Sequence, residues 1–346
     1  MINKVSVQTG QAACRKNFGR IRLRAPCRVS TAGNPKNVFP PGSLSGLYIY
    51  LFKYTFFLTI IIINISCASA PSADSRQEAV HSFSKIENFE PRWQLFADGI
   101  VSIHARIESP RLEFWAFRID LSMPGLGVVV RGGGGSGGKN TLSAKVSSFV
   151  RDNNLIIGIN AVPFDISSSR EGQPIVNAGI VISGGELISP ASPRYDALVF
   201  YMHEKRAAII RQSTIRAVNN IENAVGGFHQ ILVNGEPAPR TRETGAPSAA
   251  RHPRSAAGVS ANGRFVYLLV IDGRRAGSAG STELETALIL GAIGSWDGLN
   301  LDGGGSSAVA IRSPDGKIKV LNTPVHRLPG QERAVAGCVG IRSGSR

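Results

Sequence analysis

The sequence predicts an α+β fold, in which a single large domain is built on a mixed, largely antiparallel sheet with a few packed helices. Several runs of β-branched and aromatic residues have apolar positions on both faces, as expected for buried strands. Tight-turn sequences separate such runs and require antiparallel strand pairs. Helical patterns are few, which limits the helical part of the fold. The turn signals are Gly184-Gly185, Asn234-Gly235, Asn262-Gly263 and Pro314-Asp315-Gly316.

The first half of the domain contains strands around one predicted helix. A glycine-rich break at 131–140 precedes the segment 141–154, where helical periodicity puts Leu142, Val146 and Phe149 on one face, together with Val150. We therefore expect this segment to be a helix packed on the strands around it. The strands are expected at 111–121, 127–130, 155–160 and 197–202.

The second half contains the best-defined unit, a strand at 265–271, a helix at 282–295 and a strand at 299–302. Thr282 followed by Glu285 forms a capping box at the start of the helix. A strand–helix–strand crossover favours parallel neighbours, whose carboxyl ends meet at the same edge of the sheet. Asp272 and Asp302 are therefore expected side by side, where ligands commonly bind. The helix is expected to bury Leu284, Ala287, Leu288 and Gly291.

The N-terminal part differs in composition from the rest. Residues 1–70 contain nine Lys or Arg and no Asp or Glu, so only +6 of the net charge of +15 belongs to residues 71–346. A nucleic-acid-binding protein would be expected to carry its basic residues on the folded domain, so we predict no nucleic-acid partner. Residues 1–47 are interpreted as a basic extension, which an incorrect start codon would explain and N-terminal sequencing would test.

Residues 48–70 are interpreted as an export signal, in which a lysine precedes an apolar stretch that ends in small residues. The small residues 68–70 fit cleavage after Ala70, whereas Ser66-Cys67 resembles a bacterial lipobox that would lipidate Cys67. An uncleaved anchor is the third alternative, because residues 54–73 are uncharged. We therefore expect a periplasmic, membrane-anchored or secreted protein that contacts a membrane only through this signal or a lipid, with a linker at 71–94.

The cysteines and a glycine-rich loop argue against two further classes of protein, those stabilised by disulfides or zinc and those that bind nucleotides through a P-loop. Cys338 is the only cysteine after the predicted signal, so neither an internal disulfide nor a zinc cluster is expected there. Residues 133–140 come close to a nucleotide-binding P-loop, but Asn140 stands where the motif has a Ser or Thr that binds Mg²⁺. We interpret this segment as a flexible turn.

Four segments concentrate groups capable of chemistry: 158–165, 251–258, 270–274 and 300–307. Asp302 is the strongest candidate, because three glycines follow it and would let a ligand approach the backbone amides. Asp272 and Glu285 are candidate catalytic acids, although a turn and the capping box explain them equally. The candidate substrate-binding residues are Asn160, His252, Arg254, Gly303, Gly304, Gly305, Ser306 and Ser307. A calcium ion held by the acids is an option that the spacing does not specify.

These segments and the C-terminal end contain five distinctive motifs, "HPRSAAGV", "LLVIDGR", "GSAGSTELETALILGAI", "LNLDGGGSS" and "ERAVAGCVGI". On these motifs the sequence resembles the phosphodiester glycosidase family from about residue 95 to the C-terminus, so 95–346 is expected to be a catalytic domain of that type. The resemblance implies hydrolysis of the glycosidic bond of a sugar-1-phosphodiester, with a cleft at Asn160, Arg254, Asp272, Glu285, Asp302 and the serines. The first motif departs from the family pattern, because "NAVPF" stands where the family commonly has Asn-Gly-Gly-Phe/Tyr-Phe and keeps only Asn160 and Phe164, so the sugar is undefined.

The residues also suggest how such a reaction would run. A phosphate monoester is a good leaving group, so a cation can replace much of the general acid that glycosidases use. We expect Asp302 to face the anomeric carbon as base or nucleophile, with Asp272 or Glu285 as acid or substrate ligand. Arg254 is expected to hold the phosphate, helped by His252 and the glycine amides. The alternative is a carbohydrate-binding envelope protein that uses the same residues without turnover.

Overall fold

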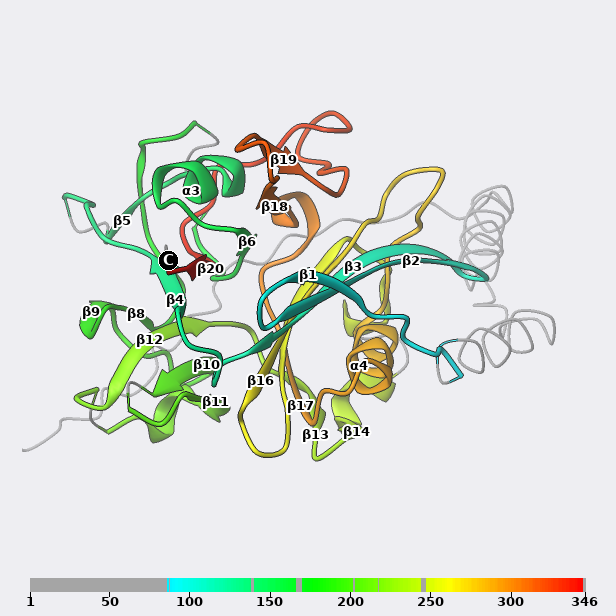
Figure 1. Ribbon diagram of the computed structural model, residues 1–346, viewed down its shortest axis with the longest axis horizontal. Coiled ribbons are helices and arrows are strands. Elements are labelled where there is room, and N and C mark those ends of the chain that lie inside the picture. Colours follow the sequence, from blue (N-terminus) through cyan, green and yellow to red (C-terminus); the bar gives the residue numbers. More distant parts are fainter. Residues whose placement is uncertain are drawn as a thin grey trace, which may run out of the picture. The chain divides into compact units, whose positions relative to one another are not determined.

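Antiparallel β-sheets make up most of the structure, a computed structural model in which residue 86 and residues 88–344 are described, apart from 138–139, 166–169, 202, 217 and 244–246 (Figure 1). The predicted extension and export signal lie outside the described residues, as does most of the predicted linker. The largest sheet has the strand order β1-β2-β3-β16-β15-β17-β13-β14. Its strands are β1 (Gln94–Ala97), β2 (Ile100–Glu108), β3 (Arg111–Asp120), β16 (Phe265–Ile271), β15 (Arg254–Val259), β17 (Asp297–Asn300), β13 (Gln230–Val233) and β14 (Glu236–Pro237).

Two five-stranded sheets and a short two-stranded sheet complete the β structure. One consists, in order, of β11 (Arg206–Arg211), β10 (Asp196–Tyr201), β12 (Ile221–Gly226), β8 (Val181–Ser183) and β9 (Glu186–Ser189). The other consists of β19 (Ile318–Val320), β18 (Val309–Arg312), β6 (Ile157–Asn160), β20 (Cys338–Ser343) and β4 (Leu126–Arg131). The short sheet pairs β5 (Thr141–Leu142) with β7 (Pro174–Ile175).

The helical part is small. Among the described residues, the α-helices are α3 (Val146–Asp152) and α4 (Glu283–Ala292), and the 3-10 turns are η1 (Gln212–Thr214), η2 (Pro239–Arg242), η3 (Pro247–Ala249) and η4 (Gly304–Ser306). Every pairing between the named strands is antiparallel. The fold is therefore mainly β, which corrects the predicted α+β class, while the antiparallel character and the single domain hold. None of the helices in the described part is long and apolar enough to cross a membrane.

The main core lies where the three larger sheets face one another, and alternation along the strands explains the continuous apolar runs. In β16, alternate residues from Val266 to Val270 point into this core, whereas those from Tyr267 to Ile271 pack with α4 on the opposite face. Both faces of the strand are thus buried, so neither set of positions is polar. The helix α3 covers the outer face of the sheet that contains β18, β6 and β20 (Figure 1).

All four predicted hairpin turns are confirmed. They join β8 to β9, β13 to β14, β15 to β16 and β18 to β19, which are antiparallel partners. At the second turn, Asn234 and Gly235 have φ values of 52° and 82°, a conformation that favours Asn and Gly. The turn residues alone therefore predicted these strand pairs.

The glycine-rich segment leads into a strand, which corrects the predicted helix at 141–154. Leu142 lies in β5, with its amide bonded to the carbonyl of Gly133 at 3.1 Å, and α3 begins only at Val146. A P-loop needs a helix directly after its glycines, so this geometry also excludes that alternative. The Asn140 side chain instead binds a segment distant in sequence: its Oδ1 accepts hydrogen bonds from the backbone amide and from Nδ2 of Asn177, both at 3.0 Å.

The crossover through α4 is partly as predicted. The strands β16 and β17 run parallel to each other, but β15 lies between them and pairs antiparallel with both. Asp272 and Asp302 therefore end at the same edge of the sheet, separated by roughly 10 Å, two strand spacings, instead of lying on neighbouring strands. The intervening strand, which comes from earlier in the chain, begins at this edge with Arg254.

The helix α4 begins with the predicted capping box: the amide of Glu285 donates to Thr282 Oγ1 at 3.1 Å, and the Thr282 amide donates to Glu285 Oε2 at 2.9 Å. The predicted apolar face is wrong except for Ala287, because Leu284, Leu288 and Gly291 are only partly buried. Both acids of the first turn are buried. Glu285 pairs with Arg251 and Glu283 lies near Arg254, so this polar side of the helix faces the protein interior. The apolar periodicity of the sequence does not predict this orientation.

Candidate active site

Asp302 lies directly beyond the end of β17, at a junction between two sheets. Its amide donates to the carbonyl of Ala161 at 2.9 Å, and its carbonyl accepts from Asn160 Nδ2 at 2.6 Å. Both partners follow or end β6, in another sheet. The backbone of Asp302 is therefore held from both sides.

Asn160 acts as the clamp of this junction. Its Oδ1 accepts from Ser255 Oγ at 2.7 Å and from the amide of Ala308 at 3.1 Å, while its Nδ2 holds Asp302. The side chain is completely buried. Asn160 was predicted to bind substrate, and in this structure both of its polar atoms have partners inside the protein.

Asp302 is partly exposed as a residue, whereas its carboxyl group is buried enough to alter its acidity. Burial raises its pKa to about 6, against the opposing effects of a hydrogen bond from Ser306, the charge of Arg333 and the amide of Gly303. An uncharged carboxyl group is favoured where solvent cannot surround it. Asp302 therefore changes its charge near neutral pH, as a group that exchanges protons or attacks an electrophile must.

The three glycines after Asp302 each have a separate steric reason. A side chain on Gly303 would place its Cβ 3.0 Å from the carbonyl of Pro253, and one on Gly305 would meet the guanidinium of Arg333 at 2.6 Å. Gly304 has a φ of 62°, in the left-handed region that disfavours other residues. The glycines thus let the protein's own groups pack against this loop, and the guanidinium of Arg274 lies next to Gly304.

The predicted backbone donors of this loop are mostly occupied. The amide of Gly304 donates to the carbonyl of Pro253 at 2.8 Å, and the amide of Gly303 donates a hydrogen bond to the Asp302 carboxylate. Ser306 and Ser307 are both buried, and the Ser306 hydroxyl joins Asp302 to Arg333, whose Nη1 lies 3.2 Å away. Within the described part of the chain, the Ser307 hydroxyl has no hydrogen-bond partner.

Arg254 differs most from its predicted role as the phosphate ligand. Its guanidinium is buried and donates to the carbonyls of Ser281 and Ala250, both at 3.1 Å, while Nη1 lies 3.7 Å from Glu283 Oε1. Burial lowers its pKa, and the charge of Glu283 opposes this effect. Because each nitrogen already has a protein partner, Arg254 braces the start of β15 against the N-terminal end of α4.

Asp272 is a buried anchor that connects distant segments. Its carboxylate accepts from Asn322 Nδ2 at 3.0 Å, from the amide of Thr323 at 3.1 Å and from Arg275 Nε at 2.8 Å. Burial raises its pKa, and these hydrogen bonds lower it. Arg275 also pairs with Glu113 in β3. The segment that leads from Asn322 to Arg333 is therefore tied to the end of β16.

Glu285 is engaged in a similar way. Besides its part in the capping box, its carboxylate accepts two hydrogen bonds from Arg251, at 2.8 and 2.5 Å. The Glu285 side chain is 1% exposed. Thus Asp302 is the partly exposed member of the three predicted catalytic acids, and the other two hold structure together.

Two arginine–histidine pairs surround the Asp302 loop. Arg274 Nη2 lies 3.1 Å from His252 Nδ1, and Arg333 Nε donates to His326 Nδ1 at 3.0 Å. His252 was predicted, whereas Arg274, Arg333 and His326 were missed as individual residues. Arg274 and Arg333 lie within motifs that carried the family resemblance, which is the sequence signal that could have found them.

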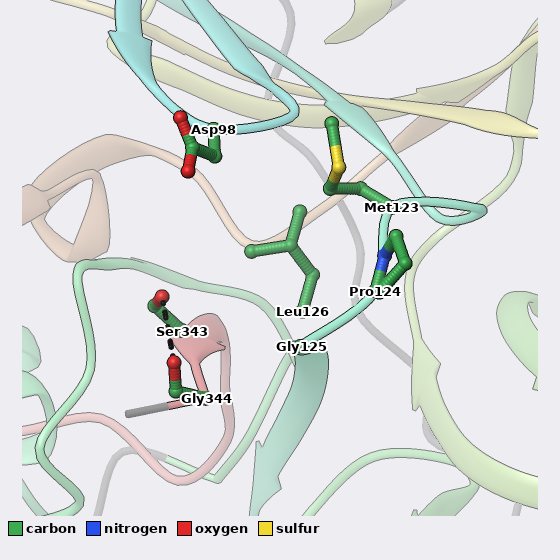
Figure 2. A pocket seen from close by; sticks show the side chains of 7 residues that line it. All are labelled: Asp98, Met123, Pro124, Gly125, Leu126, Ser343 and Gly344. Atoms are coloured by element: carbon green, nitrogen blue, oxygen red, sulfur yellow. Dashed lines mark hydrogen bonds between the residues drawn. The ribbon is translucent and has the colours of Figure 1, made fainter. Parts of the chain in front are cut away.

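Other features of the described residues lie apart from this site. No group of three or more His, Cys, Asp or Glu side chains there is arranged to hold a metal ion. A cavity of about 680 Å³ is lined by the β1–β2 turn, the β3–β4 turn and the end of β20, with Asp98, Met123 and Ser343 among its residues (Figure 2). It contains none of the predicted site residues.

Comparisons with known proteins identify the family and the fold. The family model described as phosphodiester glycosidase matches residues 153–342, more than half of the chain. The structure is similar to the catalytic domain of zebrafish N-acetylglucosamine-1-phosphodiester alpha-N-acetylglucosaminidase, auto-inhibited by its pro-peptide, with a TM-score of 0.56 and 17% identity over 75% of this chain and 92% of that one. It is also similar to a hypothetical protein from Synechocystis, with a TM-score of 0.51 and 16% identity over 73% and 64% of the two chains. Among curated protein sequences, none matches significantly.

Proposed function

The chain belongs to the phosphodiester glycosidase family, and from this membership and the geometry at Asp302 we propose that it hydrolyses the glycosidic bond of a sugar-1-phosphodiester. The observation that carries the proposal is the position of Asp302, whose backbone is held between two sheets and whose loop is bordered by arginine side chains, while burial raises the pKa of its carboxyl group to about 6. Such a group can act on the anomeric carbon while the nearby cations favour an anionic leaving group.

In the proposed mechanism, ionised Asp302 either deprotonates a water molecule that attacks the anomeric carbon or attacks that carbon itself. In the second case, water then hydrolyses the glycosyl ester on Asp302, which releases the sugar and restores the carboxyl group. The bond between that carbon and the phosphate oxygen breaks, and the phosphate leaves with the electron pair. Glycosidases usually protonate the leaving oxygen with a second carboxylic acid. Asp272 and Glu285 are buried and already bound to arginines, so we assign them to positioning and assign the stabilisation of the leaving phosphate to cations.

We further propose that the reaction takes place outside the cytoplasm, on a glycan of the cell envelope. The support is the export-signal pattern of residues 48–70, which predicts either cleavage after Ala70 or lipidation of Cys67. The sugar is not specified by this proposal, because the "NAVPF" segment departs from the family pattern, and Val162 in it is buried against Gly337.

Purified protein is expected to release free sugar and a phosphate monoester from sugar-1-phosphodiesters, at rates well above those for the corresponding neutral alkyl glycosides. The measurement is product release from a panel of sugar-1-phosphodiesters, with binding followed in parallel by calorimetry. Saturable sugar binding without product from any member would contradict the proposed hydrolysis and support a carbohydrate-binding protein instead.

The rate is expected to fall as the pH drops below about 6. Only the ionised form of Asp302 can attack or accept a proton, and burial raises the pKa of this group to about 6, so kcat/KM should decrease about tenfold for each pH unit below that value. The measurement is kcat/KM between pH 4 and pH 8. Ser306→Ala removes a hydrogen bond that lowers the pKa of Asp302, so the fall of kcat/KM on the acidic side should begin at a higher pH in this variant than in the wild type. Activity that rises toward low pH would mean that Asp302 acts in its protonated form.

A further inference from the structure

We infer that Arg274 and Arg333, each bonded to a histidine, form the site that binds the phosphate group of the substrate, in place of Arg254. This inference rests on the proposed function and names the residues that would make the enzyme selective for a phosphodiester. The loop from Asp302 to Ser306 lies against both arginines: the Arg274 guanidinium is next to Gly304, and that of Arg333 is next to Gly305.

The first support is an excess of positive charge around the loop. Burial lowers the pKa of Arg333, the negative charge of Asp302 raises it, and the positive charge of Arg274 lowers it further. Within the described part of the chain, the Arg274 side chain is bonded to His252. The pKa of His252 is lowered by burial and by neighbouring arginines, which favours its uncharged form, so it does not balance the charge of Arg274. Two arginines thus share the neighbourhood of one carboxyl group, and an anionic ligand would supply the missing negative charge.

The second support is the state of the two histidines. In each, Nδ1 faces an arginine N–H and must therefore accept, which leaves the proton of the neutral ring on Nε2. Burial and neighbouring arginine charges lower the pKa of both rings, so the neutral form dominates at pH 7. Each histidine then presents an N–H donor without adding a full charge.

The third support is a pair of polar groups without partners. Within the described residues, His326 Nε2 and the Ser307 hydroxyl are buried and make no hydrogen bond. Buried polar groups are nearly always paired, so such atoms indicate a missing ligand or water molecule. His326 lies against Gly305, and Ser307 directly follows Ser306, so both lie next to the loop that the arginines border.

Arg254 does not fit this role as well, because its nitrogens are already bound to two backbone carbonyls and to Glu283. Arg274, in contrast, is exposed and can turn its planar fork toward a phosphate for two parallel hydrogen bonds. Arg333 reaches Ser306, which also bonds Asp302, so phosphate binding and the reacting carboxyl group are connected through one hydroxyl.

The inference is tested with inorganic phosphate and the full-length protein. At constant ionic strength, phosphate should raise the melting temperature of the wild type by a few degrees, because a ligand that binds only the folded state stabilises it. Arg274→Gln and Arg333→Gln should each remove most of this rise. The matched control is Arg264→Gln, whose exposed side chain pairs with Asp120 at the opposite end of β16 and should leave the rise unchanged.

Selectivity provides the second measurement. The ratio of kcat/KM for a sugar-1-phosphodiester to that for a neutral aryl glycoside should fall by roughly 100-fold in either variant, as expected for the loss of charged hydrogen bonds. Arg274 is exposed, so Arg274→Gln is expected to fold and carries the test even if Arg333→Gln does not.

The outcomes separate this inference from the proposed function. A wild type that cleaves neither substrate, yet is stabilised by phosphate through Arg274 and Arg333, would overturn the proposed hydrolysis and keep the anion site. A wild type that cleaves the diester, with phosphate effect and selectivity unchanged in the variants, would overturn the inference alone. The absence of a phosphate effect in the wild type, together with unchanged selectivity, would also overturn it.

Discussion

Asp302→Asn is expected to lose about 10³-fold or more in the hydrolysis of a sugar-1-phosphodiester and, at pH 8, to be more stable than the wild type. The amide has nearly the same shape but can neither attack carbon nor accept a proton. The stabilisation follows from the raised pKa of Asp302, which is about 6 in the folded protein against an ordinary value of 3.8. Because folding disfavours the ionised form, the wild type loses stability as the pH rises from about 4 to about 6 and does not regain it above.

The expected gain for Asp302→Asn at pH 8 is on the order of 1–3 kcal/mol, the upper figure being about two pKa units of differential ionisation. Below pH 4 the carboxyl group is protonated in both folded and unfolded chains, so the gain should vanish. Urea unfolding at pH 4 and pH 8, together with product release, checks both effects. Asp152→Asn, at an exposed carboxylate in α3, is the matched control and should change neither. Wild-type hydrolysis by Asp302→Asn would exclude a catalytic role.

Asp272→Ala is expected to lower the free energy of unfolding by about 3–5 kcal/mol, the usual cost of removing one partner of a buried ion pair. Arg275 would keep Glu113 but lose the carboxylate that it contacts through two nitrogens. The Asn322 side chain and the Thr323 amide would lose their acceptor. Urea unfolding of the variant and the wild type measures the difference. A change within about 0.5 kcal/mol, typical of a surface substitution, would contradict the anchoring role.

Kinetics distinguish this anchoring role from the catalytic role predicted for Asp272. The anchored segment leads to His326 and Arg333, so its loosening should raise KM for the diester more than it lowers kcat. Asp272→Asn keeps an acceptor for Asn322 and Thr323 and should restore part of both stability and KM. A well-folded Asp272→Asn variant with kcat reduced as far as in Asp302→Asn would show instead that the carboxylate takes part in the chemistry.

Features with a short-range cause could be predicted from sequence. The turns Asn234-Gly235 and Asn262-Gly263 and the capping box at Thr282 depend on residues a few positions apart, and each occurs as expected. The α+β class was too helical because the apolar positions of 141–154 combine a short strand and a short helix, β5 and α3. Periodicity over so few residues does not separate the two.

The sequence by itself determined the antiparallel hairpins, the family, and the edge of the sheet at which Asp272 and Asp302 emerge. Only the tertiary structure decided which polar groups are occupied. Asn160 meets the amide of Ala308, 148 residues away, and Arg275 meets Glu113, 162 residues away. The segments that pack around an arginine decide whether it donates to buried backbone carbonyls, as Arg254 does, or stays exposed beside a histidine, as Arg274 does. Burial and partners of this kind arise from distant segments that meet only in the folded chain, so local pattern carries no signal for them.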